Sequence, residues 1–143
     1  MKRILVLFAL LMMQTCIAQE ADVKKAITTF FEGMHSRDTL TIKSVCSENM
    51  ILQSISEGKE GSKLSTERAS EFITSIAKIP AGTKIEERLL DYKIQIDGAL
   101  AHAWTPYEFY INEKFSHKGV NSFQLFKDNG VWKIIYIVDT RRK

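Results

Sequence analysis

The feature that most constrains the fold is a two-residue alternation that fills the chain from Ile85 onward. Apolar and polar side chains alternate in "LLDYKIQI" and "LAHAWTPYEFYI", and again in residues 115–127 and 131–139. Because successive strand residues point to opposite faces of a sheet, this period predicts strands with one buried face. The segments "DG", "NEK" and "DNG" between them are typical of tight turns. We therefore expect four consecutive antiparallel strands, with a bulge or an edge at Pro106.

The N-terminal half has a helical period instead. In "ADVKKAITTFFEGMHSRD", Asp22 is a candidate N-cap, and the apolar positions follow steps of three and one. They are Val23, Ala26, Ile27, Phe30, Phe31 and Met34. A short helix capped by Asp38 should follow, then a short strand at "NMILQSI" and a loop at "SEGKEGSK". A third helix should begin at Ser65 or Thr66 and end before Pro80.

Helices followed by a run of strands indicate an α+β domain with its helices on one face of the sheet. A long, twisted sheet curls, and the helices can close its open side. The predicted fold is therefore a cone, in which a curved antiparallel sheet is capped by three N-terminal helices. Residues 19–143 are enough for one such domain with one core.

Residues 1–18 have the layout of a cleavable secretory signal. Two basic residues precede an uncharged apolar run from Ile4 to Met13, which is about half the length of a membrane-spanning helix. Cleavage after Ala18 would leave a protein with no membrane span, exported to the periplasm or secreted. The alternative, a lipid anchor on Cys16, is less favoured because the residues before it are a poor lipidation motif.

Charge and cysteine content exclude several kinds of function. The chain has 20 basic and 17 acidic residues, and loss of the signal would remove two basic ones and leave a net charge of about +1. Such a charge does not indicate a nucleic-acid partner. Only Cys46 would remain, so neither an intrachain disulfide nor a cysteine metal cluster can form. We expect a buried, unreactive Cys46, no metal and no cofactor.

Three stretches of the strand region, "LAHAWTPYEFY", "FSHKGVNSFQLFK" and "GVWKIIYIVDTRR", resemble one family. The residues that carry the resemblance are Ala101, Trp104, Pro106, Tyr107, Phe109, Tyr110, Ser116, His117, Gly119, Asn121, Phe123, Trp132, Lys133, Ile134, Asp139, Thr140 and Arg141. With the order of elements, they resemble exported bacterial members of the nuclear transport factor 2-like superfamily, which includes ketosteroid isomerase and the SnoaL-like proteins. The resemblance covers about residues 20–142, although Lys118 stands where the group often has cysteine. It implies the cone fold but not an activity, since the superfamily contains enzymes and binding proteins.

Strand parity predicts which side chains face the cavity. His117, Asn121 and Phe123 share one face of their strand, and Tyr107 shares the equivalent face of the preceding strand. Asp139 and Arg141 lie where the last strand ends. The predicted ligand-binding set is Tyr107, His117, Asn121, Phe123, Asp139 and Arg141. A purely structural interpretation is also open, in which the His is a satisfied core group, the Asp–Arg pair lies at the surface and Gly119 marks a bulge.

Three functions remain compatible with these residues. The first and favoured one is binding of a small apolar molecule in the cavity, or action through protein contacts. The second is an isomerase, dehydratase or cyclase, with His117 as base, Tyr107 as donor and Asp139 orienting the imidazole. Its weakness is that no Asp or Glu is predicted to point inward from the middle of a strand. The third is a homodimer through the outer sheet face, anchored by Trp104 and Tyr110.

Overall fold

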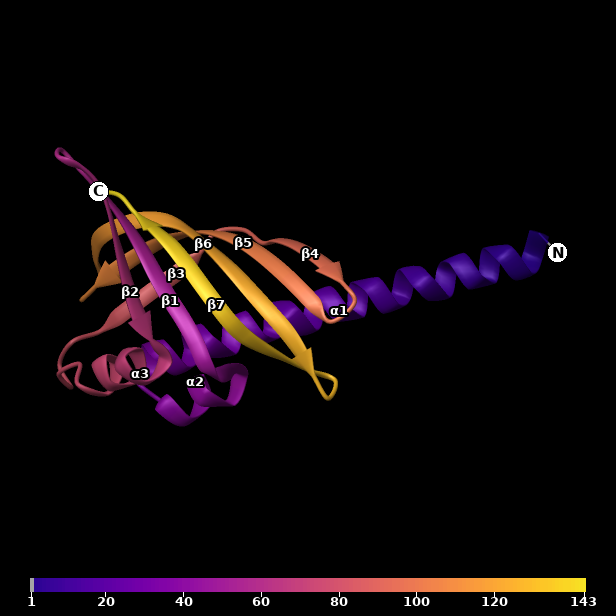
Figure 1. Ribbon diagram of the computed structural model, residues 1–143, viewed down its shortest axis with the longest axis horizontal. Helices are drawn as coiled ribbons and strands as arrows, with labels where there is room; N and C mark the ends of the chain where they lie inside the picture. Colours follow the sequence, from indigo (N-terminus) through magenta and orange to yellow (C-terminus); the bar gives the residue numbers. More distant parts are fainter. Residues whose placement is uncertain (1) are drawn as a thin grey trace.

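The computed structural model describes the backbone of residues 2–143 and the side chains of residues 18–143. Figure 1 shows a curved sheet with the helices along one side. The elements are α1 (Lys2–Ser36), α2 (Thr39–Val45), β1 (Cys46–Gly58), β2 (Gly61–Arg68), α3 (Ala69–Ala77), β3 (Ile85–Leu89), β4 (Lys93–Asp97), β5 (Leu100–Ile111), β6 (Lys114–Asp128) and β7 (Val131–Arg141). This arrangement confirms the predicted α+β cone.

The seven strands form one sheet in the order β2-β1-β7-β6-β5-β3, with β4 paired to β5 beside β3. All neighbouring strands run antiparallel except β1 and β7, which are parallel. The sheet is therefore mixed at this one pair. It curves without closing, and its two edges are β2 on one side and β3 with β4 on the other.

The predicted first strand of the meander is two strands. β3 and β4 pair with successive halves of β5, and the chain leaves the ladder between them at Leu90–Tyr92. Pro106 stands opposite this interruption, and its carbonyl accepts a hydrogen bond from the Leu90 amide at 2.8 Å. Of the two predicted alternatives at Pro106, the bulge was wrong, whereas the edge is found locally, because Pro106 faces the gap between β3 and β4. The register of β5 against β6 continues through Pro106 and shifts only between Phe109 and Tyr110.

The segment predicted as a loop, "SEGKEGSK", is part of a hairpin made by β1 and β2. The third helix accordingly starts at Ala69 rather than at Ser65 or Thr66, and the Glu71 carboxylate accepts the amide of Arg68 at 2.8 Å at its start. β2 is exposed over nearly its whole length, so it has no buried face to impose an alternation. Pairing with β1, not an apolar pattern, makes it a strand.

α1 begins at Lys2 rather than at Asp22, and its N-terminal part projects away from the sheet (Figure 1). The side chains before residue 18, Cys16 included, lie outside the described part of the chain. Signal cleavage, export and lipid anchoring therefore stay predictions. Within the described residues, no helix combines the length and the apolar character needed to cross a membrane.

The core lies between α1 and the inner face of the sheet. The predicted apolar stripe of α1 is buried throughout, with exposures of 0–6%. Its members Phe30 and Phe31 meet the ring of Phe123 edge to face, at centroid distances of 6.3 and 6.0 Å. Cys46 is also buried, and burial raises the pKa of its thiol to about 12. The thiol therefore stays protonated and packs as a small apolar group.

Candidate functional site

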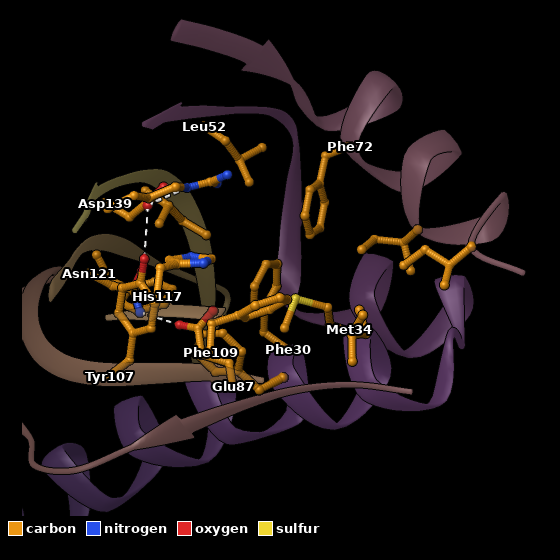
Figure 2. Close-up of a pocket in the computed structure, with 17 residues that line it drawn as sticks. Phe30, Met34, Leu52, Phe72, Glu87, Tyr107, Phe109, His117, Asn121 and Asp139 are labelled. Atoms are coloured by element: carbon orange, nitrogen blue, oxygen red, sulfur yellow. Dashed lines mark hydrogen bonds and ion pairs between the residues drawn. The ribbon is translucent and has the colours of Figure 1, made fainter. Parts of the chain in front are cut away.

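A cavity of about 220 Å³ lies between the inner face of the sheet and helices α1 and α3. Figure 2 shows Phe30, Met34 and Phe72 on its helical side, and polar side chains on its sheet side. The polar lining consists of Glu87, Tyr107, His117, Asn121, Asp139 and Arg141. All six residues of the predicted ligand-binding set line this one cavity. An apolar cavity with a few convergent polar groups is the usual form of a small-molecule site.

The strand register brings these residues together. Tyr107 pairs with Gly119, and Phe109 pairs with His117, between β5 and β6. Asn121 in turn pairs with Asp139, between β6 and β7. Because residues that pair directly across neighbouring strands point to the same face, this register turns Tyr107, His117, Asn121 and Asp139 into the cavity.

Asp139 is the centre of a hydrogen-bond network. Its carboxylate accepts from the Ser54 hydroxyl at 2.5 Å, across the parallel β1–β7 pair. It also accepts from the Tyr107 hydroxyl at 3.2 Å and from Arg141 Nε at 2.8 Å. Burial and the Asp139 charge raise the pKa of Tyr107, so this phenol stays protonated as a donor. Because three donors already occupy its carboxylate, Asp139 acts as a structural acceptor that holds Tyr107 and Arg141 in place.

Gly119 permits the close approach that completes this network. A Cβ atom at Gly119 would overlap the carbonyl oxygen of Thr140 and lie 3.0 Å from the Tyr107 ring. That carbonyl accepts the Tyr107 hydroxyl at 2.9 Å, while the Thr140 side-chain hydroxyl accepts the amide of Val120 at 3.1 Å. The Thr140 hydroxyl thus accepts the Val120 amide in place of the Thr140 carbonyl, which would be the acceptor in a regular antiparallel pair. Gly119 is explained by this contact and not by a bulge.

Glu87, on the edge strand β3, is a site residue that the sequence prediction missed. The residue as a whole is half-buried, but its carboxylate lies in the cavity and accepts from Asn121 Nδ2 at 2.7 Å. Burial raises the pKa of Glu87 to about 8, although the hydrogen bond from Asn121 acts in the opposite direction and lowers it. Glu87 is therefore largely neutral at pH 7. The expectation of no inward carboxylate was wrong.

His117 lies in the cavity but not in the predicted triad. Its Nδ1 is 3.1 Å from the Ser116 hydroxyl, and its ring stacks on Phe109 with centroids 5.0 Å apart. Tyr107 meets the same ring edge to face at 5.8 Å. Among the described contacts, no hydrogen bond joins His117 to Asp139 or Tyr107. Burial and the Arg141 charge lower the pKa of His117, so its imidazole is neutral at pH 7.

A groove of about 530 Å³ adjoins the cavity, between β1, β2 and α3. Leu52, Phe72, Ile137, Asp139 and Arg141 line both spaces, so the groove continues the cavity outward. Its other lining residues are polar or acidic: Ser54, Ser65, Thr66, Glu67, Glu71 and Ser75. Nowhere in the described side chains do three or more His, Cys, Asp or Glu gather in a way that could hold a metal ion.

Trp104 and Tyr110, the predicted dimer anchors, lie outside the cavity. Trp104 is 43% exposed, on the same sheet face as the exposed cross-strand pair of Leu100 and Phe126. Tyr110 instead packs within its own chain, where it donates to Glu108 at 2.7 Å beneath the guanidinium of Arg88.

The homodimer stays a prediction that now depends on Trp104. Sedimentation of the wild type and a Trp104→Glu variant tests it, and a monomeric wild type would contradict it.

Comparison with known proteins supports the fold. No family model and no curated protein matches the chain. Among solved structures, an NTF2-like protein from Cytophaga hutchinsonii has a TM-score of 0.70 at 12% identity, and the match covers 87% of this chain and 98% of that one.

Two further matches come from proteins whose descriptions name an activity. A proposed dehydratase of the NTF2-like family from Streptomyces avermitilis has a TM-score of 0.65 at 18% identity, covering 86% of this chain and 95% of that one. The beta subunit of a proposed aromatic-ring-hydroxylating dioxygenase from Novosphingobium aromaticivorans has a TM-score of 0.69 at 10% identity. This match covers 89% of this chain and 92% of that one. At these identities the matches establish the fold alone. This chain has the nuclear transport factor 2-like fold.

Proposed function

We propose that the protein binds a small amphipathic molecule, whose apolar body lies in the cavity and whose uncharged or cationic head lies at the groove. The observation that carries this proposal is the division of one continuous space into an apolar inner part and a polar outer part. Phe30, Phe31 and Phe123 supply the apolar surface at the inner part. Burial of a ligand's apolar body there would provide most of the binding free energy.

The charges around the groove favour a head group without negative charge. Asp139, Glu67 and Glu71 line it, and Glu87 adds a carboxyl that is largely neutral at pH 7. Among the described residues that line the two spaces, Arg141 carries the one full positive charge, and Asp139 already pairs with it at 2.8 Å. A carboxylate placed near these acidic groups would be repelled by them.

A series of ligands with the same eight-carbon chain and different heads tests this proposal. Octanol is expected to bind with a Kd of about 0.1 to 1 mM, from about 0.5 kcal/mol per non-hydrogen atom. Octylammonium should bind at least as tightly, and octanoate at least about tenfold more weakly because of the acidic groove. NMR titration of the protein at about pH 7 measures all three affinities.

Two tryptophan variants of neighbouring residues locate the binding. Leu52 lines both spaces, so Leu52→Trp should fill the passage between them and weaken octanol binding more than about tenfold. Ile51 is 43% exposed, and Ile51→Trp should leave the affinity unchanged. Equal octanol affinities in both variants, or octanoate binding as tight as octanol, would contradict the proposal.

Glu87 favours a second candidate, an enzyme that transfers a proton next to a carbonyl group. Asp139 and Tyr107 are committed to each other and to Arg141 and Thr140, which leaves Glu87 and His117 as the groups able to act on a ligand. A carboxyl with a pKa near 8 can accept and return a proton close to neutral pH. The match to a proposed dehydratase is compatible with such chemistry.

Deuterium exchange separates an enzyme from a binding protein. If Glu87 acts as a base, the wild type should speed the exchange of the α-protons of methyl hexyl ketone with solvent deuterium, increasingly as the pH rises toward about 8. Glu87→Gln should abolish this acceleration but still bind octanol, because its amide oxygen can accept from Asn121. No acceleration by the wild type would contradict the enzyme and leave binding as the function.

A further inference from the structure

His35, in the last turn of α1, touches the backbone of the site from outside the cavity. Its Nε2 atom accepts a hydrogen bond from the amide of Glu87 at 2.8 Å. β3 pairs with β5 on one side only, so its other edge is open. His35 therefore accepts the Glu87 amide on that open edge, and the side chain of the same Glu87 enters the cavity.

The direction of this hydrogen bond fixes the state of the imidazole. A backbone amide can only donate, so Nε2 must carry a lone pair and the ring proton must lie on Nδ1. Protonation of Nε2 would place two N–H groups against each other. The bond between α1 and β3 at Glu87 therefore exists only while His35 is neutral.

We propose that His35 is a positioning residue, which holds the backbone of Glu87 in place at neutral pH and releases it in acid, lowering affinity for the ligand. This inference rests on the proposed binding site. The released strand is an edge strand of five residues, held otherwise by its pairing with β5 and by the packing of Ile85 and Leu89 against the core. Its displacement would move the Glu87 carboxyl away from Asn121 and loosen the wall of the cavity.

The surroundings of His35 set where the release occurs. Its half-buried ring packs against Phe31, with centroids 6.2 Å apart. The acidic groups that act on it are Glu32 of α1 and Glu86 of β3, which raise its pKa. Burial outweighs them and lowers the pKa of His35 below its usual value. The bond is therefore intact at neutral pH and breaks only in acid, below the usual histidine pKa of about 6.5.

Octanol affinity measured at about pH 7 and about pH 5 tests the release. We expect the wild type to lose affinity about tenfold at the lower pH. His35→Gln should lose none, since its amide oxygen can accept the same hydrogen bond and does not titrate. His102→Gln on the outer face is the matched control and should keep the wild-type loss. An acid loss that persists in His35→Gln would overturn the inference and point to His117.

A second measurement does not need a ligand or a variant. The amide proton shift of Glu87 should follow the titration of the His35 ring in the free wild-type protein. A Glu87 amide that is insensitive to that titration would also overturn the inference. If octanol binds at neither pH while the amide still follows His35, the proposed function fails and the positioning contact stands.

Discussion

Phe123→Ala is expected to lower the free energy of unfolding by about 4 kcal/mol. Phe123 is fully buried and contacts Phe30 and Phe31 edge to face, so truncation removes apolar contacts from helix and sheet at once. The cavity beside it would enlarge, because these packed rings cannot collapse into the gap. Urea unfolding measures the change.

Phe126→Ala is the matched control on the same strand. Phe126 lies on the opposite face and is 44% exposed, so its truncation should cost less than about 1 kcal/mol. Similar losses for the two variants would mean that the face assignment of β6, and with it the cavity wall, is wrong.

The pH dependence of stability is expected to show the burial of Glu87. Its pKa is raised from 4.5 to about 8 in the folded protein, so the folded state binds a proton that the unfolded state releases between these values. The resulting stability is fully present below about pH 4.5 and is lost as the pH rises through about 8. The full shift corresponds to about 5 kcal/mol.

Comparison with Glu87→Gln isolates this contribution from other titrating groups. The variant keeps an acceptor for Asn121 but cannot ionise, so its stability relative to the wild type should increase by about 4 kcal/mol between about pH 5 and about pH 9. Urea unfolding at both pH values measures the difference. Parallel profiles for the two proteins would show that the Glu87 carboxyl is solvated.

The inner face of the long strands could be predicted from the sequence because the two-residue period is uninterrupted there. Tyr107, His117 and Asn121 are separated from their apolar neighbours by steps of two, and the cross-strand register keeps them together. The prediction holds through Pro106 because the missing amide coincides with the gap between β3 and β4. Strand parity needs no knowledge of the helices.

Glu87 was missed because the predicted strand was placed at "LLDYKIQI", although the alternation itself begins at Ile85. Its signal is nevertheless present in "IEERL", where Ile85 and Leu89 lie two residues to either side of Glu87 and therefore share its face. Two adjacent Glu residues and an Arg look like a solvated segment. Only the burial of Ile85 and the packing of Leu89 against the core show which face is internal.

The partners of Asp139 and the role of His35 depend on contacts between distant parts of the chain. Ser54 reaches Asp139 only because β1 lies parallel to β7, and β1 was predicted as a short strand without a partner. His35 reaches Glu87 because α1 ends beside an edge strand 52 residues away. No local sequence pattern predicts either of these contacts. The predicted orientation of His117 by Asp139 is missing for the same reason, since Ser54, Tyr107 and Arg141 occupy that carboxylate.

The most direct measurement is the set of nuclear Overhauser contacts between bound octanol and the protein. If the cavity holds the apolar body, the terminal methyl group of octanol should contact the ring protons of Phe30 and Phe123. It should make no contact with the indole of Trp104 on the outer face. Contacts confined to Trp104, or none to either phenylalanine, would contradict binding within the cone.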